Sequence, residues 1–143
     1  MAKPIITKQM LLDKKACADQ VELFEATFGD SVVVTVARAK KFAGLFNWKW
    51  APAAARMLDD AAFAEYYRDI APARTKYYQD TSAAFAEWRR TPPPTWVLFF
   101  PTEGESAFTK YNHILATALA EYSLAMATAF AKAFINMHKR SNA

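Results

Sequence analysis

The residues that could carry chemistry in this chain are two histidines, one cysteine and a pair of adjacent aspartates. His113 and His138 are the only imidazole bases or nitrogen metal ligands. They are 25 residues apart, whereas two ligands on one helix need a spacing of three or four. We therefore expect both at polar edges of the last helix. Asp59 and Asp60 are typical of a helix N-terminus, where one caps the helix and the other interacts with its dipole.

The single cysteine, Cys17, could act as a nucleophile, because a thiol near the start of a helix can have a lowered pKa. It also lies on an apolar stripe with Val21 and Phe24, so we expect a small, buried hydrophobic residue instead. The three glycines are far apart, which excludes a glycine-rich phosphate cradle. We therefore expect no enzyme, no catalytic residue, no metal site and no cofactor.

Basic residues gather in the N-terminal part of the chain. Residues 1–58 hold nine Lys or Arg against five Asp or Glu, while the remainder is close to balance. A helix flanked by lysines could contact phosphates, although lysines on the outer face of a short helix are ordinarily just solvated. The candidate nucleic-acid-binding residues are Arg38, Lys40, Lys41 and Lys49, in a region that also holds Lys14, Lys15, Trp48 and Trp50.

A second candidate site is an apolar segment that follows the run Pro92-Pro93-Pro94. The segment reads Trp96-Val97-Leu98-Phe99-Phe100-Pro101. Large apolar side chains on an extended connector must be covered either by the helices of the same chain or by another chain. Burial is the simpler interpretation. In the alternative, Trp96, Phe99 and Phe100 bind a partner.

The elements that must position these residues are dominated by an eleven-residue repeat in the C-terminal half. Eleven residues in three turns is ~3.67 per turn, so each position returns to nearly the same helix face. The copies begin at Phe63, Arg74, Phe85, Phe108, Leu119 and Phe130. Their third positions are Glu65, Lys76, Glu87, Lys110, Glu121 and Lys132, and their fourth are Tyr66, Tyr77, Trp88, Tyr111, Tyr122 and Ala133. Two antiparallel helices with these signs would pair opposite charges along a seam filled by the fourth positions.

Two long helices should carry the repeat. The first begins at Asp59 or Asp60 and ends near Arg90, with a kink or break near Ile70 because Pro72 removes a hydrogen bond. Thr102 and Glu105 have capping-box spacing and should start the second, which ends in a basic turn at Lys139 and Arg140.

The N-terminal part should form four short helices, with an extended link at residues 31–34. Thr7 should cap the first helix, and the second should carry Cys17 to Phe28 and end at Gly29. Thr35 should cap the third helix, which has Phe46 on its apolar face. The fourth helix should run from Pro52 to Leu58.

We therefore predict an all-α protein with a cluster of short N-terminal helices and a long antiparallel helical hairpin. The chain of 143 residues should be a single domain. Its parts would be a short-helix basic subdomain at 5–58, repeat-hairpin helices at 59–91 and 103–140, and a Pro/aromatic connector at 92–102. The apolar stretch from Phe108 to Met137 is interrupted by charges, so we expect no membrane span and a cytoplasmic location.

The N-terminal residues resemble the opening of small uncharacterised proteins encoded by bacteriophages and prophages. The shared pattern is Ile6-Thr7, Leu12, Ala16-Cys17, Gln20-Val21, Phe24, Phe28-Gly29 and Val34-Thr35. Those proteins continue into Ala- and Tyr-rich helical repeats, as this chain does. The resemblance brings no established activity with it, and it implies a location in the bacterial host cell.

Together these observations favour a non-enzymatic interaction protein that binds a host or virion macromolecule, such as an inhibitor of a host defence complex. We expect a protein partner, and surplus aromatic surface would also allow self-association. A small nucleic-acid-binding protein that uses the N-terminal lysines is the alternative. A phage morphogenesis or structural component is the second alternative.

Overall fold

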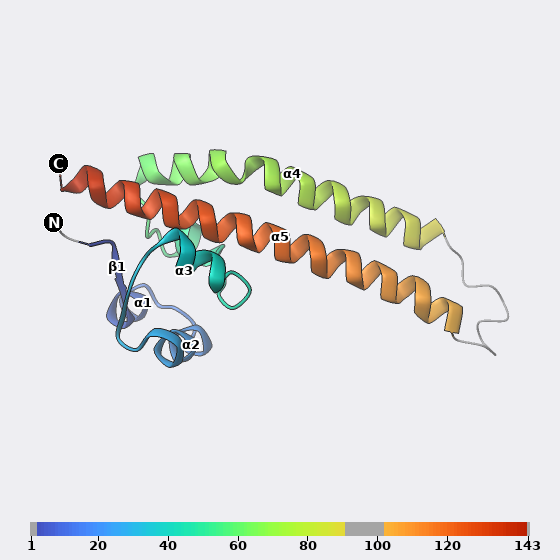
Figure 1. Ribbon diagram of the computed structural model, residues 1–143, viewed down its shortest axis with the longest axis horizontal. Helices are drawn as coiled ribbons and strands as arrows, with labels where there is room; N and C mark the ends of the chain where they lie inside the picture. Colours follow the sequence, from blue (N-terminus) through green and yellow to red (C-terminus); the bar gives the residue numbers. More distant parts are fainter. Residues whose placement is uncertain (1–2, 91–101, 143) are drawn as a thin grey trace. The chain divides into compact units, whose positions relative to one another are not determined.

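The computed structural model describes residues 3–90 and 102–142 and is mostly helical, with a long pair of helices (Figure 1). Helix α4 covers Asp60–Arg90 and helix α5 covers Thr102–Ser141. The chain forms two compact units: unit 1 is Met1–Ile70 with Ser123–Ala143, and unit 2 is Ala71–Tyr122. Unit 2 is therefore one continuous segment, whereas unit 1 is built from two.

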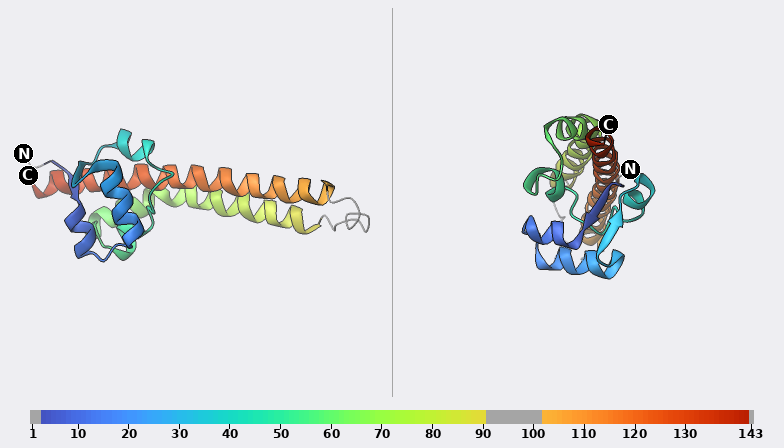
Figure 2. Two further views of the ribbon diagram at one scale, coloured as in Figure 1. Left: turned by 90° about the horizontal axis from the view of Figure 1, so that it is seen from below. Right: turned by 90° about the vertical axis from the view of Figure 1, so that its left-hand side faces the viewer.

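Unit 1 contains a short antiparallel strand pair, which corrects the prediction of an all-α fold. Strand β1 (Ile5–Thr7) pairs with β2 (Ser31–Val33), with Ile5 opposite Val33; the two strands are visible in the right-hand view of Figure 2. The expected extended link is thus a strand. β1 was missed because three residues are too few to show an alternating pattern, and its β-branched side chains gain a partner only from a segment far along the chain.

Three short α-helices accompany the strands: α1 (Lys8–Asp13), α2 (Ala18–Phe28) and α3 (Val36–Lys41). The predicted caps are confirmed, because Thr7 Oγ1 accepts from Met10 N and Thr35 Oγ1 accepts from Arg38 N, both at 3.1 Å. Gly29 ends α2 with a φ of 76°, a left-handed conformation that favours glycine.

Three local predictions are wrong. Cys17 is exposed at the N-cap of α2, because the helix begins one residue too late to turn the thiol onto its apolar stripe. Helix α3 ends at Lys41, so Phe46 lies beyond it. The segment from Pro52 to Leu58 is no α-helix; a π-helical turn at Trp50–Ala54 takes its place.

The core of unit 1 is a chain of aromatic rings that joins the short elements to α5. Phe28 lies 5.0 Å from Phe42, and Trp48 lies 5.9 Å from Phe130, measured between ring centroids. Phe130 and Phe134 are the largest fully buried side chains described, each about 1% exposed. Burial of these rings is the main stabilising contribution that the sequence offers to this unit.

Helices α4 and α5 begin and end close to the predicted residues. Asp59 caps α4, since its Oδ1 accepts from Ala62 N at 2.8 Å, and α5 ends in a basic turn that includes Lys139 and Arg140. Pro72 lies inside α4, and the helix is not broken there. The missing N–H of Pro72 removes one helical hydrogen bond, and the remaining turns are enough to keep α4 helical on both sides.

Unit 2 is an antiparallel pair made from the second part of α4 and the first part of α5. Its seam contains the small residues Ala84 and Ala118, about 5% and 4% exposed, which let the two helices approach closely. Tyr77 stacks on Tyr122 with ring centroids 5.1 Å apart, and Trp88 stacks on Tyr111 at 5.3 Å. Tyr122 is about 6% exposed, so the pair of Tyr77 and Tyr122 lies in the seam, whereas Trp88 is 38% exposed at its edge. The fourth repeat positions therefore fill only part of the seam.

Candidate interaction surface

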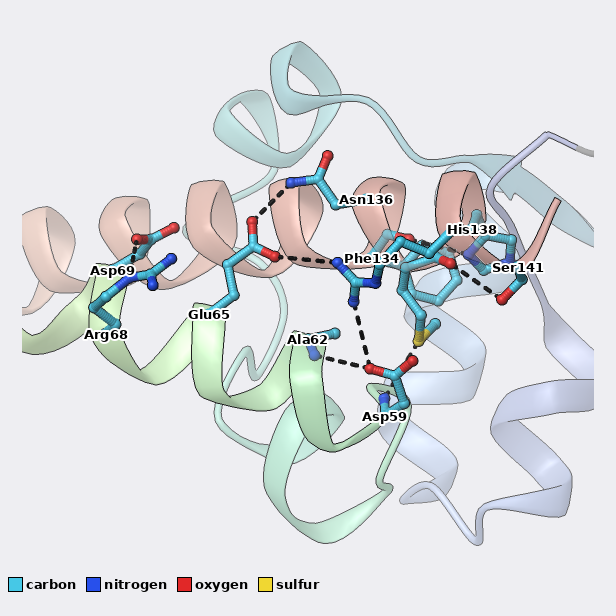
Figure 3. A network of polar contacts seen from close by, with 11 residues as sticks. Asp59, Ala62, Glu65, Arg68, Asp69, Phe134, Asn136, His138 and Ser141 are labelled. Atoms are coloured by element: carbon cyan, nitrogen blue, oxygen red, sulfur yellow. Dashed lines mark hydrogen bonds and ion pairs between the residues drawn. The ribbon is translucent and has the colours of Figure 1, made fainter. Parts of the chain in front are cut away.

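A polar network in unit 1 joins the start of α4 to the end of α5 (Figure 3). Asn136 Nδ2 donates to Glu65 Oε1 at 2.7 Å, and the Arg140 guanidinium lies 3.7 Å from Glu65 and 3.5 Å from Asp59. Each of these carboxylates is therefore held by a cation, an amide or a helix N-terminus. The network fixes the ends of two helices, which is the capping role predicted for Asp59.

The two histidines and the cysteine are not brought together. His113 is exposed in unit 2, whereas His138 is half-buried in unit 1, with Nδ1 3.0 Å from the Phe134 carbonyl oxygen. Within residues 3–90 and 102–142, no group of three His, Cys, Asp or Glu side chains is placed to hold a metal ion.

Four charged third positions of the repeat, together with Asp80, define one side of unit 2, here called the charged face: Lys76, Asp80, Glu87, Lys110 and Glu121. Lys76 Nζ donates to Asp80 at 2.7 Å and to Glu121 at 2.8 Å, and Lys110 lies 3.3 Å from Glu87. The hydrogen bonds to Asp80 and then Glu121 raise the pKa of Lys76 above its usual value. Two of the three expected pairs across the seam therefore form. Glu65 pairs with Asn136 and Arg140 instead of Lys132.

The opposite side of unit 2 is apolar and exposed, and is here called the aromatic face. Phe85 contacts Tyr111 with ring centroids 6.2 Å apart, and Trp88 contacts Phe108 at 6.3 Å, so rings from both helices adjoin. Tyr78 lies seven residues before Phe85, about two turns along α4 and on the same side of the helix. Leu119 lies eleven residues after Phe108, about three turns along α5 and on the same side as Phe108. The members of the aromatic face, with their exposed fractions, are Tyr78 (59%), Phe85 (43%), Trp88 (38%), Phe108 (51%) and Leu119 (49%).

The repeat itself contains a signal for this face. Phe85, Phe108 and Leu119 are all first positions of the repeat, and Phe85 and Leu119 each follow a buried seam residue, Ala84 and Ala118, about 100° around the helix. In unit 1, the first position of the last copy, Phe130, is buried against Trp48. The same repeat position is thus covered in unit 1 and exposed in unit 2.

The predicted basic residues do lie at the surface of unit 1. Arg38, Lys40 and Lys41 are exposed on α3, and Lys49 is exposed just before the π-helical turn. The Arg38 guanidinium already makes one hydrogen bond within the chain, from Nη1 to the Val33 carbonyl oxygen at 2.8 Å. Lys41 Nζ lies 5.4 Å from the centroid of the Phe42 ring.

The tryptophan expected beside these cations is not a free stacking surface. Trp48 is half-buried, contacts Phe46 and Phe130, and its Nε1 donates to the Ala43 carbonyl at 3.1 Å. Trp48 therefore packs in the core of unit 1 and is not available as a platform for the bases of single-stranded nucleic acid.

Unit 1 also contains a cavity of about 100 Å³ with an almost wholly apolar lining. Its walls include Phe24, Phe28, Phe42, Phe46 and Trp48. At its edge, Asn47 N donates to Gln20 Oε1 at 3.1 Å, so this polar pair is satisfied internally. The pocket is partly open to the surface, and its apolar lining fits a gap between packed rings.

The candidate residues Trp96, Phe99 and Phe100 lie outside the described residues. The segment Phe108–Ser141, by contrast, is described and is long and apolar enough to cross a membrane by length and composition, with a mean hydropathy of 1.5 in its best window. Only 39% of that window is buried within the protein. Core helices pass the same test, so this finding does not assign a membrane location.

No family model, no curated protein and no solved structure matches this chain.

Proposed function

We propose that this protein is a non-enzymatic, phage-derived interaction protein that acts by binding a host or virion macromolecule, for example as an inhibitor of a host defence complex. The observation that carries the proposal is the aromatic face of unit 2. Trp and Tyr are among the residues that dominate the binding energy of protein interfaces, and this face contains Trp88 and Tyr78. A second chain that covered these rings would remove a large apolar surface from water.

The eleven-residue repeat gives this surface its regularity in the proposal. The repeat sets small residues at the seam, pairs opposite charges on one face and leaves first positions on the other. Ion pairs such as Lys76 with Glu121 are exposed and contribute only ~0–1 kcal/mol each, so their role is to select the register of the two helices. The site of action that follows from the phage-like opening is the cytoplasm of the bacterial host.

Affinity purification from a bacterial lysate, with and without nuclease, tests the proposal. The wild-type protein should retain a protein partner after nuclease treatment. The double variant Trp88→Ser/Phe108→Ser should lose that partner, while His113→Ser, an exposed change elsewhere on unit 2, should keep it. Equal capture by all three proteins would exclude the aromatic face as the binding surface.

The alternative, nucleic-acid binding, is favoured by one observation: Arg38, Lys40 and Lys41 are exposed within one short helix, with Lys49 nearby in the sequence. Each phosphate contact should steepen the dependence of log K on log salt by about 0.9. The triple variant Lys40→Gln/Lys41→Gln/Lys49→Gln should flatten that slope. An unchanged slope would mean that these lysines do not contact phosphates. A structural role in phage morphogenesis remains the second alternative, and a virion protein as the captured partner would support it.

A further inference from the structure

We infer that the aromatic face of unit 2 binds a second copy of this chain, in an antiparallel arrangement related by a two-fold axis. The inference rests on the proposed function in one respect, namely that the aromatic face is a protein-binding surface. It goes further because it names the chain that covers this face when the proposed partner is absent, so that the second copy and the partner compete for the same residues.

The first argument is the amount of apolar surface. The aromatic face contains four aromatic side chains and Leu119, each between 38% and 59% exposed. An aromatic side chain has roughly 200 Å² to bury, so these five residues alone expose on the order of 450 Å² per copy. Two copies would bury roughly 900 Å², and the residues between the rings bring the total to the ~1,000 Å² that a stable interface requires.

The second argument is that a lone pair of helices is an incomplete bundle. Each helix of unit 2 buries one stripe against the other, and the first repeat positions form a further stripe beside it. Bundles bury such stripes by adding helices on that side, and a second hairpin supplies two at once. The result would be a four-helix bundle with the charged faces outside.

The third argument is that the aromatic face can pack on its own copy when the two copies run in opposite directions. On α4 the face extends from Tyr78 to Trp88, 10 residues or about 15 Å along the helix. A two-fold axis that crosses α4 near Thr81 runs through this stretch. Large apolar side chains of the two copies then meet without bringing charges together.

The same axis matches the remaining members of the face. It places Tyr78 opposite Phe85 on α4, and it places Leu119 opposite Tyr111 on α5, because the axis crosses α5 near Leu115. The antiparallel arrangement is also closed, so it makes dimers and no fibres.

The charged face does not offer an equivalent surface. Lys76 and Lys110 already pair with carboxylates of the same copy, and burial of these pairs would remove their hydration without adding new partners. The carboxylates Asp80, Glu87 and Glu121 all lie on this face, which leaves the aromatic face free of their charge.

The test is the oligomeric state of the full-length chain, measured by light scattering and analytical ultracentrifugation from about 1 to about 200 µM, which spans the affinity expected for an interface near the lower size limit. Wild type and His113→Ser should show the mass of a dimer at the upper end. Trp88→Ser/Phe108→Ser should be a monomer whose helical circular dichroism is retained, because both side chains are already partly exposed. A monomeric wild type over the whole range, or a dimer that survives the double change, would overturn the inference.

Cross-linking tests the arrangement itself. The only cysteine is exposed, so a Cys17→Ser background allows one new cysteine to be placed at will. Thr81→Cys, at the proposed axis, should be joined between copies by a short bis-maleimide reagent. Ala83→Cys is the matched control, since Ala83 is exposed and lines the groove on the charged face. Cross-linking at residue 83 in preference to 81 would refute the antiparallel packing.

The results separate this inference from the proposed function. A monomer that still captures a lysate protein through Trp88 and Phe108 would sink the dimer and leave the function standing. A dimer whose lysate partner is unaffected by these changes would support the dimer and move the partner to another surface. Co-sedimentation of a monomeric wild type with anionic vesicles, lost in the double variant, would assign the aromatic face to a lipid surface and overturn the dimer.

Discussion

The stacked pair Tyr77 and Tyr122 allows the packing of unit 2 to be tested by the energy of unfolding. Tyr122 is only about 6% exposed, and its ring stacks on Tyr77 with the centroids 5.1 Å apart. Truncation to alanine removes roughly 120 Å² of buried apolar surface, which is worth about 3 kcal/mol at 25 cal/mol per Å². Loss of the aromatic pair adds about 0.5–1.5 kcal/mol. We expect Tyr122→Ala to lower the free energy of unfolding by about 3–5 kcal/mol.

Two companion variants make the result specific. Tyr77 is half-buried, so Tyr77→Ala should cost about half as much as Tyr122→Ala. Lys76, the neighbour of Tyr77 in sequence, is on the exposed charged face, so Lys76→Ala should change the unfolding free energy much less than Tyr77→Ala.

Urea unfolding followed by far-ultraviolet circular dichroism measures all three variants. A loss below about 1 kcal/mol for Tyr122→Ala would mean that its ring is not part of a stabilising core. Equal losses for Lys76→Ala and Tyr77→Ala would mean that the seam and the charged face have been assigned to the wrong sides of α4.

Three further predictions concern the caps, the polar network and the pH dependence. Thr7→Ala and Thr35→Ala should each lower the unfolding free energy by about 1 kcal/mol, with Thr→Ser as the control that keeps the capping oxygen, as measured by thermal and urea unfolding. Asn136→Ala should cost about 1–2 kcal/mol because Glu65 loses a direct hydrogen bond, while Asn142→Ala near the same helix end should cost less; the reverse order in urea unfolding would contradict the assigned network. Because the pKa of Lys76 is raised in the folded protein, wild type should be more stable than Lys76→Gln by a constant amount below about pH 10.5. This stability difference should become smaller as the pH rises toward and through the raised pKa. A difference that grows with pH would mean that folding lowers the pKa of Lys76.

Local signals in the sequence were enough to place most helices. Thr7, Thr35 and Asp59 cap helices as predicted. A cap is a hydrogen bond between a side-chain oxygen and the backbone N–H three residues later, so it forms without any other part of the chain. The alternating charges of the repeat likewise predicted pairs of opposite charge such as Lys76 with Glu121. With a fixed period, residues at the same repeat position lie on the same side of the helix along its whole length.

Features that depend on distant segments were not predictable in this way. The strand pair needs Ile5 and Val33 to meet, and neither short segment shows a strand pattern by itself. Cys17 was misplaced by one residue at a helix start, which is enough to move a side chain from the core to solvent. The aromatic face was missed because periodicity shows that Phe85 and Phe108 share a side, but only the packing of unit 2 shows that nothing described there covers them.

The division of the chain into units affects the order in which its parts can form. Unit 2 is continuous from Ala71 to Tyr122, so its contacts are available as soon as that segment has been synthesised. Unit 1 must wait for residues made after unit 2: the hydrogen bond from Asp59 N to the Met137 sulfur joins residues 78 apart in sequence. Closing so long a loop carries an entropic cost before the contact returns any energy, which slows folding. During that interval Trp48 lacks its contact with the ring of Phe130, so this part of the aromatic core of unit 1 is not covered until the end of α5 has been made.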